Sequence, residues 1–355
     1  MLKRLIAMLA VTALLVGSTA FYYHKTGTRT DGVFYEATGI RPDAPLMYVD
    51  GNAVSAEEYL YWLDSVCEYL ASYVGGTPDF TVSVTDEMTL GQYAKADAAN
   101  TVTLYAVVRQ MAKEYGITLN EEDLAELEAQ RQQYVSYYGS EEVYLQQLQV
   151  LGLSEEMLRR IEEVPYLYNR MFLAFSDPAS ELYPGEDALR TYADENGFVT
   201  AQLLYFPTAG LEESEQADMK AKAADYATQL GSAADKQATY EALASQLGLT
   251  ASEAGLTFCA ADSDPAVYQA VSALAAGEVS SVIEGSSGYY VAMRMETNYA
   301  SLAEDLFNIR LQDRQDSVKV EYSGKQYDRI EAGSFYTALN NARAALMQKL
   351  SDPAQ

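Results

Sequence analysis

Histidine is nearly absent from this chain of 355 residues, because His24 is the only one. Imidazole is the general base of Ser-His and Cys-His catalysis and a common zinc ligand. The chain beyond residue 24 therefore excludes those catalytic sites and any His-based metal site, and we expect neither a metal nor a cofactor. Carboxylate-only and Ser-Lys chemistry stay open, although no residue spacing indicates either.

Cysteine is scarce as well. Cys67 and Cys259 lie far apart in apolar surroundings, and no CxxC pair exists. The favoured interpretation is that both are small buried side chains. A disulfide between them, formed outside the cell, is the alternative.

Basic residues are few, with 24 Lys and Arg against 51 Asp and Glu and a formal net charge of -27. Nucleic acid is excluded as a partner, because proteins meet a phosphate backbone with Lys and Arg. The acidic surface also predicts salt-dependent binding of basic partners. A hydrophobic content of 49% is typical of a globular protein, and the length favours two folded units.

An apolar segment opens the sequence. Lys3 and Arg4 precede a run from Leu5 to Gly17, which predicts a secretory signal within residues 1–24. The alternative is an uncleaved membrane anchor from Leu5 to Tyr23. In both cases the rest is exported, either anchored to the cell membrane facing outside or secreted after cleavage. Residues 25–45 are predicted to be a linker.

Residues 46–195 read as a helical module. A short strand and a turn precede a helix for which Ser55 and Glu58 predict a capping box. Gly116 ends a second helix, and Asn120 caps the next. The module is rich in Tyr, whose rings bind apolar segments at low entropic cost. We expect most of these rings in the core and a minority along a groove.

The pattern changes at Phe198. FVTAQLLYFP and GYYVAMRME alternate as strands, and Ala-rich helical segments lie between them. Residues 196–298 are therefore predicted to form an α/β domain, and the helical residues 299–355 to pack with the helical module. The expected fold class is α+β multidomain, with the α/β domain inserted between helical segments.

Four stretches carry a family resemblance: VDGNAVSAEEY, EYGITLNEEDL and LGLSEEML in the helical module, and AVSALAAGEVSSVIEGSSGYYVAM in the α/β domain. Their order resembles the exported foldases of the SurA and PrsA type. The resemblance covers nearly all of the chain after the linker. It implies a SurA-N-like helical chaperone module that carries a parvulin-type peptidyl-prolyl isomerase domain with an FKBP-like α/β fold.

The resemblance also implies where a prolyl site would lie. Parvulins usually begin their first strand with His-Ile-Leu and end with Gly-Tyr-His, with the two imidazoles facing each other across the sheet. Here these positions fall on Gln202 and Tyr290. Both side chains can donate and accept, so an amide to phenol bond would span the same gap. The alternative is that they only fill the sheet core. The substrate-binding candidates that follow are Leu204, Phe258, Val267 and Tyr268.

The expected function is an extracytoplasmic folding factor that binds nonnative secreted polypeptides, X-Pro segments among them, with an isomerase-like domain impaired in catalysis. One alternative is an active isomerase with a Gln/Tyr network, since X-Pro rotation needs no covalent chemistry. Another is a structural partner of an envelope assembly. The predicted membrane contact is confined to the N-terminal segment.

Overall fold

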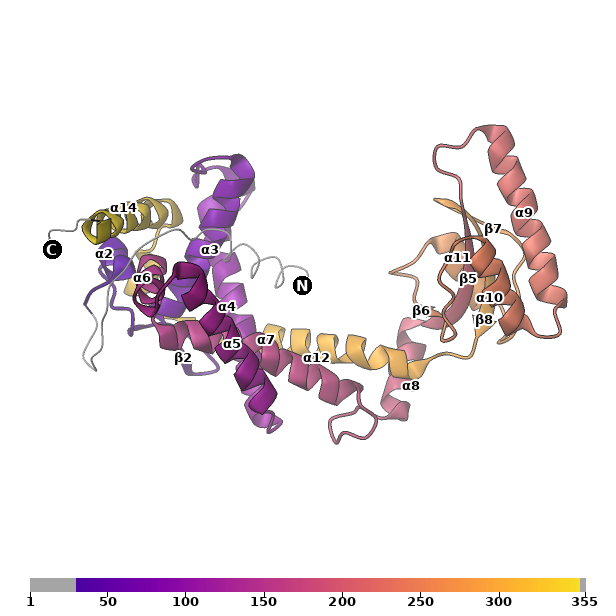
Figure 1. Cartoon of the computed structure of the whole chain (residues 1–355), viewed down its shortest axis with the longest axis horizontal. Helices are drawn as coiled ribbons and strands as arrows, with labels where there is room; N and C mark the ends of the chain where they lie inside the picture. The colour runs from indigo at the N-terminus through magenta and orange to yellow at the C-terminus, as the bar shows by residue number, and fades with distance from the viewer. Residues whose placement is uncertain (1–29, 352–355) are drawn as a thin grey trace. The chain divides into compact units, whose positions relative to one another are not determined.

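The computed structural model describes residues 30–351, so the predicted signal or anchor at 1–24 and the start of the linker lie outside the described residues. Among residues 30–351, no helix is long and apolar enough to cross a membrane. The chain forms two compact units (Figure 1). We call Phe172–Ile309 the α/β unit, and the segments up to Met171 and from Arg310 onward the helical unit. The pattern in the sequence predicts these boundaries at 195/196 and 298/299 instead.

The helical unit is built around two long helices, α3 and α4, and an antiparallel sheet of order β2-β1-β9. Strand β9 comes from the C-terminal segment and pairs with β1, so both ends of the described chain contribute to one sheet. The elements of its N-terminal half are α2 (Val33–Thr38), β1 (Pro45–Val49), β2 (Asn52–Ser55), α3 (Ala56–Val74), β3 (Ser83–Thr85), β4 (Met88–Thr89) and α4 (Leu90–Glu114).

Of the remaining helices of this unit, α14 packs on α3 and α4 and lies along α2, where the Phe34 and Phe335 ring centroids are 6.2 Å apart, and α5 packs on α6 (Figure 1). The chain passes between the two units within α7 and within α12. These elements are α5 (Glu121–Tyr138), α6 (Glu141–Leu151), α7 (Glu155–Ser176), α12 (Ala303–Ser317), β9 (Val320–Tyr322), α13 (Lys325–Asp328) and α14 (Ala332–Ser351).

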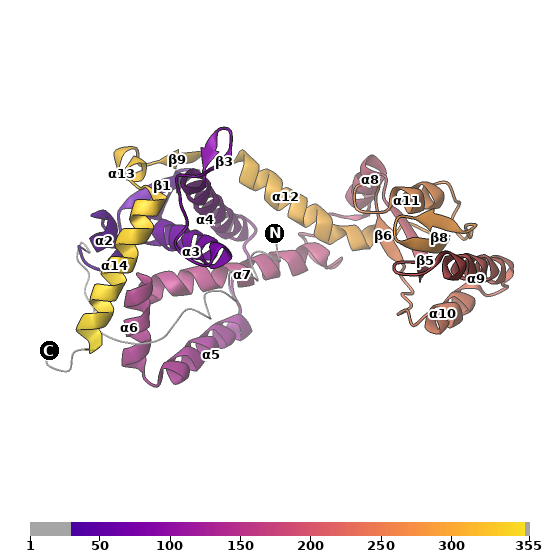
Figure 2. The same cartoon turned by 90° about the horizontal axis from the view of Figure 1, so that it is seen from above.

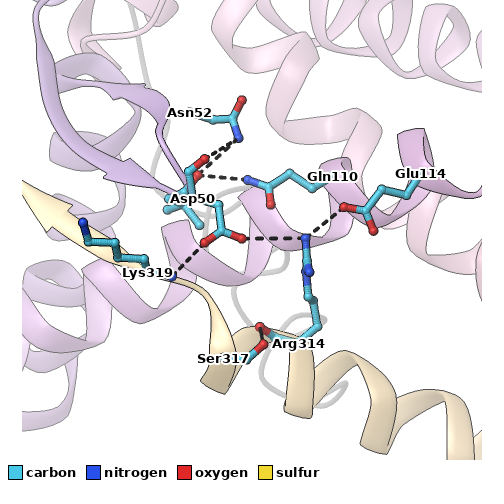
Figure 3. A network of polar contacts seen from close by, with 8 residues as sticks. Asp50, Asn52, Gln110, Glu114, Arg314, Ser317 and Lys319 are labelled. Carbon is cyan, nitrogen blue, oxygen red and sulfur yellow. Dashed lines mark hydrogen bonds and ion pairs between the residues drawn. The ribbon is translucent and has the colours of Figure 1, made fainter.

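A polar network ties the turn between β1 and β2 to the C-terminal segment (Figure 3). The Asp50 carboxylate accepts a hydrogen bond of 2.8 Å from the Lys319 backbone N–H. Arg314 lies 3.7 Å from the same carboxylate and 2.8 Å from Glu114 on α4. Gln110 on α4 donates to the Val49 carbonyl at 3.1 Å. These bonds join the β1–β2 turn, α4 and the C-terminal segment, which lie far apart in the sequence.

The predicted helix ends at Asn120 and Gly116 are present in this unit, whereas the predicted Ser55–Glu58 capping box is only half formed. Ser55 accepts a hydrogen bond of 3.2 Å from the Glu58 backbone N–H, as predicted. The Glu58 carboxylate, however, pairs with Arg109 on α4 at 2.5 Å. Asn120 caps α5 and forms a capping box with Asp123. Gly116 follows α4 with φ of 67°, a conformation that Gly adopts without strain.

The α/β unit contains a four-stranded antiparallel sheet of order β6-β5-β8-β7. Alternate residues of its strands pack into two hydrophobic cores, one on each side of the sheet. Leu204 and Phe206 face α9 and α10, whereas Ala201 and Leu203 face α11, on the other side of the sheet (Figure 2). The elements are α8 (Glu186–Asn196), β5 (Val199–Pro207), α9 (Glu213–Ser232), α10 (Lys236–Gln246), β6 (Leu256–Phe258), α11 (Pro265–Ser272), β7 (Ile283–Gly285), β8 (Gly288–Met295) and the 3-10 helix η1 (Tyr299–Leu302).

Helix α8 explains why the α/β unit begins before residue 196. Its buried residues Leu189 and Ala193 form one apolar cluster with Leu302 and Ala303. Both segments lie outside the predicted 196–298 domain, and their apolar faces bury each other. Removing apolar surface from water stabilises this pairing, so the two flanking segments fold with the sheet between them.

Candidate functional site

Gln202 lies on β5 with its side chain toward α10. It is 1% exposed and sits opposite Met293 of β8. Its amide N–H groups donate to the Gln237 side chain at 2.9 Å and to the Ser252 carbonyl at 2.8 Å. Gln202 thus anchors the loop between α10 and β6, and its donors are used in that structural role.

Tyr290 lies on the other side of the sheet. Its ring stacks on that of Tyr205, with centroids 4.9 Å apart and planes 28° from parallel. Its hydroxyl is 2.8 Å from the Ser287 hydroxyl, and the Tyr205 hydroxyl donates to the Ser287 carbonyl at 2.9 Å. Both rings are half-buried and Ser287 is exposed, so this group is open to solvent.

The structure does not bring Gln202 and Tyr290 together. Tyr290 sits opposite Tyr205, and Gln202 opposite Met293, which places the two side chains on opposite faces of the sheet. The direct amide to phenol bond considered from the sequence is therefore not formed. Leu203 and Tyr205 are the β5 residues that share a face with Tyr290. Tyr205, three residues after Gln202, is the β5 residue directly opposite Tyr290, and Leu203 is opposite Ala292. Residues an odd number apart on a strand lie on opposite faces, which is why Gln202 is not among them.

The turn between β7 and β8 is held by Asp264, the N-cap of α11. Its carboxylate accepts hydrogen bonds from the backbone N–H of Ala266 at 2.9 Å and of Ser286 at 2.6 Å. The bonds from Ser286 are the main reason that the pKa of Asp264 lies below its usual value. Gly285 allows close packing here, because a Cβ on it would lie 2.7 Å from the Tyr290 ring.

The predicted substrate-binding residues fall in different places. Leu204 is fully buried toward α9 and α10, away from Tyr290. Phe258 and Val267 are buried in the α11 core, at 5% and 3% exposure. Tyr268 is half-buried in that core, and its hydroxyl donates to the Gly197 carbonyl at 2.8 Å. Only the last three share the α11 side of the sheet with Tyr290.

Sequence reasoning missed three members of this group, namely Tyr205, Ser287 and Asp264. Signals for Tyr205 and Asp264 were present in the sequence. Tyr205 and Leu203 follow the strand period of two, and an Asp-Pro pair commonly opens a helix as N-cap and first residue. We call Tyr205, Asp264, Ser287 and Tyr290 the α11-face cluster.

The α11-face cluster offers hydroxyl donors and acceptors beside two aromatic faces. Such a surface can hold a peptide through stacking and hydrogen bonds. It contains no imidazole. Cys259 and Cys67 are buried free thiols, and the Cys259 thiol lies 3.3 Å from the Asp262 carboxylate. Among residues 30–351, no group of His, Cys, Asp and Glu is arranged to hold a metal ion.

Comparison with known families matches residues 186–304 to the PPIC-type PPIASE domain. This range covers the four-stranded sheet together with α8 and η1, the helices that the predicted domain left out. The chain therefore carries a parvulin-type domain, and its fold class is α+β with a helix-rich second unit. No relative among curated proteins matches the sequence.

Solved structures with similarity to the chain include two PrsA proteins and a SurA-like chaperone. The foldase protein PrsA from Streptococcus pneumoniae is 19% identical and covers 88% of this chain and 97% of its own, with a TM-score of 0.27. PrsA from Bacillus subtilis is 14% identical, with coverages of 78% and 94% and a TM-score of 0.27. A SurA-like chaperone from Campylobacter jejuni is 12% identical, with coverages of 79% and 99% and a TM-score of 0.25. These scores are low, so only the match of residues 186–304 to the PPIC-type domain carries further argument.

Proposed function

We propose that this protein is an exported folding factor that binds nonnative secreted polypeptides and whose parvulin-type domain is impaired in prolyl isomerisation. One observation carries the proposal. The parvulin-type sheet presents Leu203, Tyr205 and Tyr290 on the face where the family resemblance implies a pair of imidazoles. His24 is the only histidine of the chain, so no other segment supplies an imidazole to the sheet.

Binding of nonnative chains is supported by exposed aromatic side chains on the helical unit. Tyr69, Tyr73 and Tyr137 are 57%, 82% and 72% exposed, whereas Tyr59 and Tyr144 are buried. Exposed rings add apolar contact area with little loss of side-chain entropy. The acidic composition favours basic segments in the bound chains.

The first test is suppression of aggregation. At an equimolar ratio, the full chain is expected to delay the aggregation of a chemically unfolded basic protein, measured by light scattering. Raising the salt concentration should weaken the effect, because salt screens attraction between exposed charges. A full chain that leaves the aggregation rate unchanged at every salt concentration would remove the basis for the chaperone role.

The second candidate function is an active isomerase, and the hydroxyl groups of the α11-face cluster favour it. Exchange NMR, which measures the rate of cis/trans exchange in an Ala-Pro peptide, distinguishes the active isomerase from the impaired one. We expect the full chain not to accelerate cis/trans exchange, because no imidazole pair underlies the cluster and Gln202 is held by the Ser252 loop. Acceleration that Tyr290→Phe abolishes in a folded protein would instead establish catalysis by the cluster. Lys222→Gln, at an exposed position of α9, is the control.

A further inference from the structure

A cleft of about 290 Å³ opens in the helical unit between α3, α6 and α14. Its walls are mostly apolar, and Met347 stays 38% exposed, so one side of the cleft is open to solvent. The lining residues are Tyr61, Val150, Leu151, Ala344 and Met347 on the apolar side, and Asp64, Ser65, Glu68, Asn340 and Arg343 on the polar side.

The single cation of the cleft lining is already engaged. Arg343 forms two bonds to the Asp64 carboxylate, at 2.5 and 3.0 Å, and its Nε donates to the Val150 carbonyl at 2.9 Å. Asp64 is 5% exposed, and a bidentate pair of this kind neutralises both charges locally. Arg343 therefore has little capacity left for another anion.

The carboxylate of Glu68 has no cation of its own in the cleft, because Arg343 forms its close pair with Asp64. Its carboxylate lies 3.7 Å from Arg343, and 23% of its side chain is exposed. The pKa of Glu68 lies above its usual value, because burial and the charge of Asp64 raise it more than Arg343 and a hydrogen bond from Tyr336 lower it. Burial also raises the pKa of Asp64, and when both carboxyl groups are ionised the two carboxylates and one guanidinium leave the cleft one unbalanced negative charge. The Val150 carbonyl adds to it, because it lies at the C-terminal end of α6, the negative end of the helix dipole.

A cation on a long aliphatic stem complements this combination of charge and shape. The stem of a lysine packs along apolar walls while its ammonium group reaches a carboxylate. A divalent metal fits less well, since it takes several oxygen ligands and the cleft offers one carboxylate without a bidentate partner. We propose that the cleft binds a lysine side chain of a bound polypeptide, with Glu68 holding the ammonium group. This inference rests on the proposed function, which supplies the polypeptide.

NMR of methionine methyl groups tests the site directly. The probe is an acetylated and amidated peptide Gly-Gly-Lys-Gly-Gly, compared with the same peptide carrying norleucine in place of Lys. We expect the lysine peptide to shift the Met347 methyl signal, assigned by its loss in Met347→Leu, and the norleucine peptide to leave it unchanged. Equal shifts with both peptides would overturn the role of charge.

Two variants locate the binding. Glu68→Gln keeps an acceptor for Tyr336 but removes the charge, and it is expected to weaken lysine-peptide binding at least about tenfold, the effect of losing about 1.4 kcal/mol of interaction. Ala344→Met fills the apolar wall without changing any charge and should also block binding. Glu87→Gln, an exposed acid outside the cleft, is the matched control. Unchanged affinity in Glu68→Gln would refute the proposal.

The remaining outcomes separate this inference from the proposed function. If n-butylammonium shifts Met347 and the lysine peptide does not, the cleft does not admit a polypeptide and the inference is wrong. If the full chain suppresses aggregation but no lysine ligand shifts Met347, the inference alone fails. If the lysine peptide binds but aggregation is not suppressed, the site stands and the proposed function fails.

Discussion

Arg109→Met is expected to lower the free energy of unfolding of the helical unit by about 3–5 kcal/mol, the cost of leaving a buried charge without its partner. Glu58 on α3 is fully buried, with its side chain 0% exposed, and Arg109 on α4 is 2.5 Å away. The next cation, Arg160, is 3.9 Å from Glu58 and has a side chain that is 48% exposed. Among residues 30–351, the second carboxylate oxygen of Glu58 has no hydrogen-bond partner, so only the more distant and more exposed Arg160 would compensate the charge.

Urea denaturation followed by tryptophan fluorescence measures this loss in the right unit. Trp62 is the only tryptophan, lies on α3 and is 4% exposed. The double variant Glu58→Met/Arg109→Met should regain most of the stability, because an apolar pair replaces an ion pair at little net cost. Arg159→Met, which breaks the more exposed pair with Glu163, is the control and should cost less than about 1 kcal/mol. A loss of that small size in Arg109→Met would mean that water solvates Glu58.

Local chemistry made much of the fold predictable. Ser55 and Asn120 lie at the N-terminal ends of helices, because their side-chain oxygens accept hydrogen bonds from backbone N–H groups that have no partner within the helix. Gly116 follows the end of a helix, because glycine adopts a positive φ without strain. The strands Val199–Pro207 and Gly288–Met295 follow the predicted stretches closely, since both alternate with a period of two. Signals of this kind lie within a few residues of the feature they predict.

Long-range contacts were not predictable in the same way. The pairing of β1 with β9 joins residues near 48 to residues near 321, and no local pattern marks it. Helix α8 belongs with η1 for the same reason, since only the fold brings Leu189 to Leu302. The domain boundaries drawn from changes of local pattern therefore differ from those of the structure.

The prediction of the candidate site failed because the sequence did not establish which residues of β5 lie on the same face of the sheet as Tyr290. Matching motifs places Gln202 at a family position, but it does not say which face of the sheet a side chain takes. The contacts that bury Gln202 come from Gln237 and Ser252, dozens of residues away. Tyr205, three residues after Gln202, is the residue that the strand register places opposite Tyr290, and an odd number of residues along a strand leads to the other face of the sheet.

Gly288→Ala is expected to unfold or severely loosen the sheet of the α/β unit. Gly288 has φ of 154°, and a Cβ on it would lie 2.2 Å from the Phe206 carbonyl oxygen, a backbone atom that cannot move aside without breaking β5–β8 pairing. Strain at such a backbone conformation costs about 1–3 kcal/mol, and overpacking adds about 1–3 kcal/mol. The sum, about 2–6 kcal/mol, is a large part of the stability of a typical domain, about 5–15 kcal/mol.

Hydrogen exchange of the β5 and β8 amides measures this effect, because opening of the β5–β8 pair exposes their N–H groups to solvent. In Gly288→Ala these amides should exchange at least about a hundredfold faster, the change for about 2.7 kcal/mol of lost stability. Gly231→Ala on α9 is the matched control, since a Cβ there meets no atom within 4 Å and alanine favours a helix. The control should exchange as slowly as the wild type or more slowly. Slow exchange in Gly288→Ala would show that the turn after β7 has room to shift, and the α11-face cluster would then be less rigid than its contacts imply.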